Sequence, residues 1–585
     1  MKKLKESIEI IDSKKGDSTI DLVLDTLNKG KQALVFVNSK RSAEKTAEDI
    51  SKVLKESEKG DELSKNIIKV LSSPTKQCKR LSDCIKKQVA FHHSGLVSKQ
   101  REIIEEEFLN GNVKIICSTP TLALGIDLPA YRAIIKDIKR FSIRGMEYIP
   151  VMEYHQICGR AGRPGKETEG EAIVIVSNEK VKGKVLDRYV KGKPEEILSK
   201  LAVEPVLRAY LLSLISSEFI NNKKEIVEFF SKTFWAFQYQ DIEQLSLMLE
   251  NNLKDLEEWE FVEVEDINSK REREKNKENQ IEENTGKNKK KQNNEFVEAS
   301  LLDKSNNENM KIKSTLLGKR VAQLYLDPFS AHNIISELRR ADKNKSDYFA
   351  YLFTIVSTNE MRPYLSIRAG EKERLDILSG EYKDQIKTPD PWEEEYEDFI
   401  SVFKTCLMLD SWLGEDTEEK ILEKFGVRPG ELQYKLTNSD WLLYSSQEIA
   451  RILRLDDAQR VLRELRLRVK YGIKKELLNL LKLKGIGRVR ARMLFKNGFK
   501  DTSNLRKGDI NQISRLIGPT MAKNIKEQLG EKVEISYMDD EKRDKRKDTK
   551  NDTRRENNIS IEQKETKKIM QHNLPQDMQR VLSDY

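Results

Sequence analysis

Long apolar runs and clustered cysteines are both missing from this chain of 585 residues. No stretch of about eighteen apolar residues occurs, which argues against a membrane-spanning helix. The basic start Met1–Lys5 precedes no apolar segment of the kind that a secretory signal needs. The 5 cysteines are scattered, so they indicate no disulfide framework, and we expect a cytoplasmic protein. We find no repeat of the solenoid type.

Charged residues are abundant but nearly balanced in sign. The sequence has 106 Lys and Arg against 97 Asp and Glu, which gives a net charge of +9. This mild excess permits nucleic-acid binding without requiring it. With 37% hydrophobic residues the chain can build real cores, and its length predicts about three to five domains.

Short apolar runs rich in β-branched residues alternate with helical patterns in the first part of the chain. We expect strands at 33–37, 88–91, 113–117 and 172–176, and the start of another at 133–135. This alternation is typical of a parallel sheet with helices on both faces.

The strongest local signal is the segment Gln156–Gly165, which reads Q-I-C-G-R-A-G-R-P-G. Arg160 and Arg163 are three residues apart and each follows a glycine, so they would share one face of a helical turn. A guanidinium offers forked donors that suit a polyphosphate. An arginine that reaches the γ-phosphate from outside a P-loop accelerates hydrolysis by about 10³–10⁵.

Companion segments follow three of the expected strands. They are Phe36–Arg41 (F-V-N-S-K-R), His92–Leu96 (H-H-S-G-L) and Cys117–Pro129 (C-S-T-P-T-L-A-L-G-I-D-L-P). Polar residues at the carboxyl ends of strands form ligand sites in open α/β sheets. A metal site at His92 and His93 is the alternative, but the spacing of the nearby cysteines argues against zinc, and we expect no metal.

These segments together resemble motifs IV, IVa, V and VI of the second RecA-like domain of superfamily 2 helicases. Their form is that of the Ski-type branch, and within it the chain resembles the archaeal Hjm family of DNA repair helicases through Tyr537. The resemblance implies ATP with Mg²⁺ as the cofactor. It assigns the ATP side to Gln156, Arg160, Arg163, Gly125 and Asp127, and the DNA side to Ser39, His93, Gly95 and Thr119.

Residues 132–151, between motifs V and VI, contain a stretch of turn and strand character at Asp137–Gly145. In the resembling family a β-hairpin at this place splits the duplex. An ordinary loop between two strands is the alternative.

The resemblance also covers three later domains. It implies a winged helix, a helical ratchet domain whose long helix carries Tyr434, Asn438 and Trp441, and a helix-hairpin-helix domain. Trp441 would stack on a base of single-stranded DNA, or else belong to the core. The family has an arginine where this chain has Tyr434, beside Lys435.

The helix-hairpin-helix signature is L-K-G-I-G-R-V-R-A-R, beginning at Leu483. Its tight turn points backbone N–H groups at a phosphate, and basic side chains add to the attraction. The residues expected at this contact are Gly485, Gly487, Arg488 and Arg490. A plain turn between packed helices is the alternative.

We therefore predict a multidomain protein, α/β followed by mainly α. Its expected parts are a RecA-like sheet domain (1–188), a winged helix (189–320) with a disordered insertion (265–298), a helical ratchet bundle (321–475), a helix-hairpin-helix domain (476–537) and a charged disordered tail (538–585). The tail ends in a glutamine, a hydrophobic residue three positions later and an aromatic residue three positions after that. These residues, Gln579, Leu582 and Tyr585, resemble a sliding-clamp interaction box.

A P-loop and an acidic D-E-x-[HD] run, which a helicase needs for ATP, do not occur in the sequence. We expect the first RecA-like domain to come from a separate polypeptide that is encoded by the other part of a split gene. An incomplete gene model is the alternative explanation for the missing domain. The complex would be a 3′→5′ helicase on forked or branched DNA. The alternatives are a non-catalytic adaptor that binds single-stranded DNA, and part of an RNA helicase of the same branch.

The missing P-loop generates a direct prediction. The purified chain alone should release no phosphate from ATP above background, with or without single-stranded DNA, because no residue pattern in it can hold the β- and γ-phosphates. A phosphate-release assay measures this. Turnover by the chain alone would contradict the expectation of a split site.

Overall fold

The computed structural model describes residues 16–71, 74–142, 145–162, 169–201, 203–266, 310–368 and 370–531. The chain divides into two compact units, Met1–Thr502 and Ser503–Tyr585. Most of the expected insertion, from 267 on, and the whole expected tail lie outside the described residues. All five cysteines are free thiols. Over the described ranges, no helix combines the length and the apolar content needed to cross a membrane.

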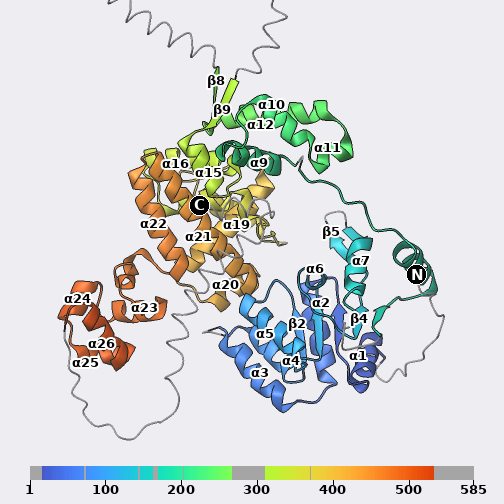
Figure 1. Ribbon diagram of the computed structural model, residues 1–585. Helices are drawn as coiled ribbons and strands as arrows, with labels where there is room; N and C mark the ends of the chain where they lie inside the picture. Colours follow the sequence, from blue (N-terminus) through green and yellow to red (C-terminus); the bar gives the residue numbers. More distant parts are fainter. Residues whose placement is uncertain are drawn as a thin grey trace, which may run out of the picture. The chain divides into compact units, whose positions relative to one another are not determined.

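A parallel sheet of five strands opens the first unit (Figure 1). Its order is β2-β3-β1-β4-β7, so β2 and β7 are the outer strands. The strands are β1 (Ala33–Phe36), β2 (Val89–His92), β3 (Ile115–Ser118), β4 (Arg132–Ile135) and β7 (Glu171–Val174). Every neighbouring pair is parallel. The first four strands are buried along their whole length, as continuous apolar runs predict, and the expected parallel sheet is confirmed.

Helices connect these strands, and polar residues begin several of them. The side chains of Asp17, Ser39, Ser57 and Thr75 accept backbone N–H bonds at the starts of the first four helices. The helices are α1 (Ser18–Asn28), α2 (Lys40–Lys52), α3 (Glu58–Lys69), α4 (Lys76–Ile85), α5 (Ser98–Leu109), α6 (Thr121–Gly125), α7 (Val151–Cys158), α8 (Glu179–Val185) and the π-helical turn η1 (Leu186–Val190).

A two-stranded hairpin lies between β4 and α7. It consists of β5 (Lys139–Ser142) and β6 (Gly145–Tyr148), which pair antiparallel. Phe141 stands opposite Met146, and the two side chains are 81% and 57% exposed. The structure therefore has two paired strands between motifs V and VI, and not the ordinary loop that was the alternative.

The next segment is mainly helical and carries a second antiparallel strand pair. Strand β9 ends at Ser314, because the Thr315 hydroxyl accepts the Gly318 N–H at 2.9 Å and begins a helix. The elements are α9 (Glu204–Ser216), α10 (Lys223–Ser231), α11 (Phe234–Tyr239), α12 (Ile242–Glu258), β8 (Val262–Asp266), β9 (Met310–Ser314) and α15 (Leu316–Gln323).

A bundle of helices follows and shares one hydrophobic core with α9–α15. That core runs from Leu207 to Val469 without a break at the expected domain boundary near 320. The elements are α16 (Pro328–Asn344), α17 (Tyr348–Val356), η2 (Asn359–Met361), α18 (Lys372–Gly380), α19 (Tyr396–Leu413), α20 (Glu418–Phe425), α21 (Pro429–Ile452) and α22 (Asp456–Tyr471). The sheet has a separate core of its own.

The expected helix-hairpin-helix domain, 476–537, crosses the division between the two units. Its first hairpin, with the short turns η3 (Lys475–Leu477) and η4 (Leu480–Lys482) and helix α23 (Arg488–Lys496), belongs to the first unit, where Arg492 pairs with Glu415 at 2.5 Å. Helix α24 (Thr502–Lys507) begins at the division. The second unit contains α25 (Ile510–Ile517) and α26 (Pro519–Gln528), joined at Gly518.

Arg132, the first residue of β4, is completely buried and ties helix α1 to the sheet. Its Nε donates to Glu171 at 2.8 Å, and its Nη1 donates to the Leu22 carbonyl at 2.9 Å and the Thr26 hydroxyl at 2.8 Å. The same nitrogen lies 2.9 Å from an Asp25 carboxylate oxygen. One guanidinium thus satisfies acceptors from α1 and β7 together.

Removing this guanidinium should destabilise the sheet strongly. We expect Arg132→Ala to lower the free energy of unfolding by about 3–5 kcal/mol, because it leaves the carboxylates of Asp25 and Glu171 without their buried partner. Lys29 approaches the same two carboxylates nearer the surface, and Lys29→Ala should cost at most about 1 kcal/mol. Hydrogen exchange of the β1 and β4 amides measures both variants. Equal losses of unfolding free energy in the two variants would contradict the role of Arg132 as the buried partner of both carboxylates.

Candidate nucleotide and nucleic-acid sites

Three adjacent strands, β2, β3 and β1, end at the segments from which phosphate contacts were predicted. Ser39 follows β1 and is exposed, with its hydroxyl accepting the Ser42 N–H at 3.1 Å. Thr119 follows β3 and is half-buried, with its hydroxyl 2.9 Å from that of Thr121. Gly95 lies just beyond β2. Because carboxyl ends of parallel strands share one edge, the structure gathers these segments there.

His93 and Gly95 do not fit the direct nucleic-acid contacts predicted for them. The His93 side chain is 1% exposed, its Nδ1 accepts the Gly95 N–H at 3.1 Å, and its Nε2 lies 3.2 Å from Glu44. The Gly95 carbonyl accepts the Gly430 N–H at 3.0 Å. Both residues are therefore occupied inside the protein, and Ser94 between them is the exposed residue of the loop.

His92 faces away from this group. Its Nε2 lies 2.7 Å from a Glu105 oxygen, whereas His93 is directed to Glu44. The residues that the structure describes include no group of three His, Cys, Asp or Glu side chains placed to hold a metal ion.

Glu44, on helix α2, is a buried carboxylate that the sequence analysis missed. Its oxygens accept from Gln77 at 2.8 Å, Arg80 at 2.7 Å and Arg428 at 3.2 Å, in addition to the His93 contact. Burial alone would raise the pKa of Glu44, but the hydrogen bonds and the Arg428 charge hold it at about 2. Burial lowers the pKa of His93, so at neutral pH the ring is uncharged and carries its proton on Nε2.

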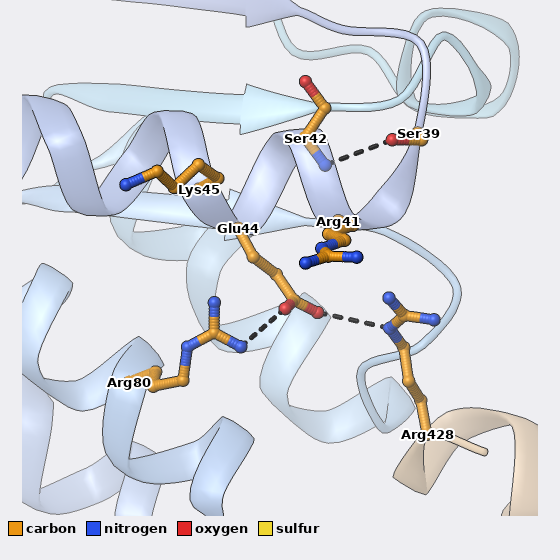
Figure 2. A pocket seen from close by; sticks show the side chains of 7 residues that line it. All are labelled: Ser39, Arg41, Ser42, Glu44, Lys45, Arg80 and Arg428. Atoms are coloured by element: carbon orange, nitrogen blue, oxygen red, sulfur yellow. Dashed lines mark hydrogen bonds and ion pairs between the residues drawn. The ribbon is translucent and has the colours of Figure 1, made fainter. Parts of the chain in front are cut away.

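Cationic side chains surround this carboxylate in a shallow depression at the start of α2 (Figure 2). Figure 2 shows Arg80 and Arg428 approaching Glu44 from opposite sides. The depression is lined by Ser39, Arg41, Ser42, Glu44, Lys45, Arg80 and Arg428. Four cations, one enclosed carboxylate and two hydroxyls beside a helix N-terminus favour a sugar-phosphate backbone as the ligand.

Arg160, just after α7, reaches across to α6. Its Nε and Nη2 donate to the Ala123 carbonyl at 3.1 and 2.6 Å, and its Nη1 donates to Asp127 at 3.2 Å. The Arg160 side chain is 22% exposed and that of Asp127 is 95% exposed. Gly125 ends α6 in open surroundings. Gln156 lies four residues before Arg160 and is half-buried.

The structure thus brings Arg160, Asp127 and Gly125 together as the motifs predicted. Arg163 lies outside the described residues. The cluster fits one side of a site for ATP with Mg²⁺, since a guanidinium pairs with phosphate and an open glycine lets a phosphate approach the backbone.

Helix α21 places Trp441 against the core of the helical bundle. The ring is half-buried, and its Nε1 donates to the Leu324 carbonyl at 3.2 Å. This geometry favours the core alternative for Trp441. Tyr434, two turns earlier, is 46% exposed and is the ring on this helix that a base could reach.

Two further polar residues of α21 hold the backbone of η2 and the residues just after it. The Lys435 amine donates to the carbonyls of Met361 and Pro363, the latter at 2.7 Å, and Asn438 donates to the Glu360 carbonyl at 2.9 Å. Burial lowers the pKa of Lys435 to about 8. Lys435 therefore does not stand in for the family's arginine on the exposed surface.

The first hairpin of the helix-hairpin-helix segment keeps only part of its predicted contact surface. Gly485 has a φ of 88°, and Gly487 is open on the side where a Cβ would project. Arg490 donates to the Gly485 carbonyl at 2.8 Å and stays partly exposed. Arg488 is half-buried and stacks on the Trp412 ring, with its guanidinium carbon 5.1 Å from the ring centroid, and it donates to the Asp416 carbonyl. The clamp-box residues Gln579, Leu582 and Tyr585 lie outside the described residues.

Three family models match successive parts of the chain. Residues 14–165 match the helicase conserved C-terminal domain, residues 349–472 match domain 4 of an archaeal helicase, and residues 477–531 match a SAM-like helix-hairpin-helix tandem. The expectations of a helicase domain and a helix-hairpin-helix segment are confirmed.

Curated relatives named ATP-dependent DNA helicase Hel308 match nearly the whole chain. The protein of Methanococcus vannielii is 38% identical over 552 residues, which cover 90% of this chain and 69% of that relative. The proteins of Pyrococcus horikoshii and Pyrococcus abyssi are each 35% identical over 535 residues and 67% of their own length, covering 89% and 90% of this chain. The narrower resemblance to Hjm stays a prediction.

The cationic depression generates a prediction for DNA binding. Arg41→Ala should weaken binding of single-stranded DNA equally for all sequences and reduce the slope of log K against log salt by about 0.7, the value for one lost phosphate contact. Lys52→Ala, on the same helix but outside the depression, should change neither quantity. Fluorescence anisotropy over a range of salt concentrations measures both. An unchanged slope for Arg41→Ala would contradict a phosphate contact there.

Proposed function

Since the chain belongs to the Hel308 family of ATP-dependent DNA helicases, we propose that it forms the second half of a motor that moves 3′→5′ along one DNA strand. Its substrates are forked or branched DNA in repair and recombination. One observation carries the proposal: Ser39, Ser94 and Thr119 lie at the carboxyl edge of three adjacent strands, beside the cationic depression.

The nucleotide end of the motor uses the cluster of Arg160, Asp127 and Gly125. ATP bound with Mg²⁺ supplies the free energy for movement. Arg160, which now donates to α6 and to Asp127, is placed to transfer its donors to phosphate oxygens when a P-loop half closes against it. Gln156, on helix α7, is proposed to line the same side of the site.

We further propose that a separate polypeptide supplies the P-loop half of this site. Affinity purification of the chain from its native lysate, followed by mass spectrometry, tests this arrangement. Recovery of a chain with a P-loop and an acidic quartet supports it. Recovery of none favours the adaptor alternative.

The hairpin β5–β6 is proposed to part the duplex. Phe141 and Met146 present an exposed apolar pair at opposite positions of the two strands, which suits stacking on a base pair at a fork. The relatives' printed names favour DNA over RNA as the substrate. Clamp binding through Gln579, Leu582 and Tyr585 stays a separate prediction.

Arg163 provides the test of the shared ATP site. In the assembled helicase, Arg163→Ala should lower ATP turnover by about 10³–10⁵, because the charge that develops on the γ-phosphate loses its guanidinium. Affinity for single-stranded DNA should stay within about twofold, since the phosphate contacts of the strand are elsewhere. Lys182→Ala, in a surface ion pair of α8, is the control. Persisting turnover in the Arg163 variant would refute the finger assignment.

A further inference from the structure

The loop His93–Leu96 and the start of helix α21 meet backbone to backbone. The Gly430 N–H donates to the Gly95 carbonyl at 3.0 Å. A Cβ on Gly430 would lie 2.4 Å from the Ser94 carbonyl oxygen and 2.5 Å from that of Leu96, and one on Gly95 would lie 2.3 Å from the Arg428 side chain. Only glycines allow so close an approach, so this contact is built into the sequence on both sides.

Glu44 stands at the centre of this contact and reaches both of its sides. Through His93 it fixes the loop, because the same imidazole accepts the Gly95 N–H. Through Arg428, the residue that precedes α21, it fixes the helix start. Its carboxylate is 5% exposed, so loss of its charge would leave the two nearby arginines without their shared partner. A separate pair, Lys40 with Glu431 at 2.5 Å, ties the same two elements.

We propose that Glu44 is a positioning residue that joins the loop 93–96 to helix α21, so that the two elements hold one DNA strand as a single rigid grip. The proposal rests on the proposed function, which makes the carboxyl edge of the sheet a strand-binding surface. Glu44 itself does not touch the strand. It aims Arg80 and Arg428 into the depression and keeps Ser94 and Ser39 at a fixed separation.

The direction in which DNA affinity changes when the Glu44 charge is removed separates a positioning role from simple electrostatic repulsion. If Glu44 acted only as a negative charge near DNA, its removal would reduce repulsion and strengthen binding. If it positions the grip, its removal weakens binding although the site becomes more positive. We expect Glu44→Gln to weaken binding of a fluorescein-labelled 20-nucleotide oligo-dT about tenfold or more, the effect of losing a charged buried hydrogen bond.

Three further variants isolate the link to α21. Arg428→Met should weaken binding by a similar factor, and the double variant Glu44→Gln/Arg428→Met should be no weaker than Arg428→Met alone, because both remove one link. Gly430→Ala should also weaken binding, although alanine favours a helix, because its Cβ pushes the loop away. Glu48→Gln is the matched control, since Glu48 lies one turn along α2 and pairs with Arg80 but with neither His93 nor Arg428.

Hydrogen exchange of the full chain supplies a readout that is independent of DNA. In Glu44→Gln, peptides covering 93–97 and 428–434 should exchange faster together, while the β1 and β3 peptides stay protected. Unchanged exchange, or binding as tight as wild type, would overturn the proposal. Failure of the wild-type chain to bind oligo-dT would overturn the proposed function instead, and exchange alone would then decide whether Glu44 joins the two segments.

Discussion

A buried carboxylate surrounded by nitrogen donors holds the carboxyl edge of the sheet against the start of helix α21. Removing Glu44 from water is costly, and the cost is offset only because Gln77, Arg80, Arg428 and His93 all converge on it. With a pKa of about 2, the group stays charged over the whole physiological pH range. The directions of two arginines in the cationic depression, and the shape of the loop after β2, both follow from that single charge.

The cluster of Arg160, Asp127 and Gly125 is joined to the carboxyl edge of the sheet by a short piece of chain after β3. Thr119 precedes helix α6, Gly125 ends it, and Arg160 donates to the Ala123 carbonyl within it. A helix of five residues bends little, so a shift of the Arg160 end is passed to the Thr119 end. Under the proposed function, this piece of chain couples phosphate chemistry at one end to movement of a DNA strand at the other.

The sequence was informative wherever the cause of the structure is local. The five parallel strands follow from runs of apolar residues, and the meeting of Arg160 with Asp127 follows from short motifs. For the antiparallel pair at 139–148, the sequence left an ordinary loop as the alternative. Which polar groups are buried could not be predicted from the sequence, because their burial depends on partners that lie far away along the chain. The loop of His93 and Gly95 packs against Arg428 and Gly430, and Arg488 stacks on the ring of Trp412. The boundary expected near 320 stays a prediction, and the helices on both sides of it share one core.

In the described residues the sheet ends at two outer strands, and their form limits how this protein associates with itself. In the part of the chain that the structure describes, the outer strands β2 and β7 are four residues long, and β7 begins with Glu171, whose carboxylate is engaged by Arg132. A strand of four residues offers a neighbouring sheet few hydrogen bonds, and a carboxylate at its start disfavours close approach of another acidic edge. The short outer strands thus help to protect the fold from edge-to-edge aggregation.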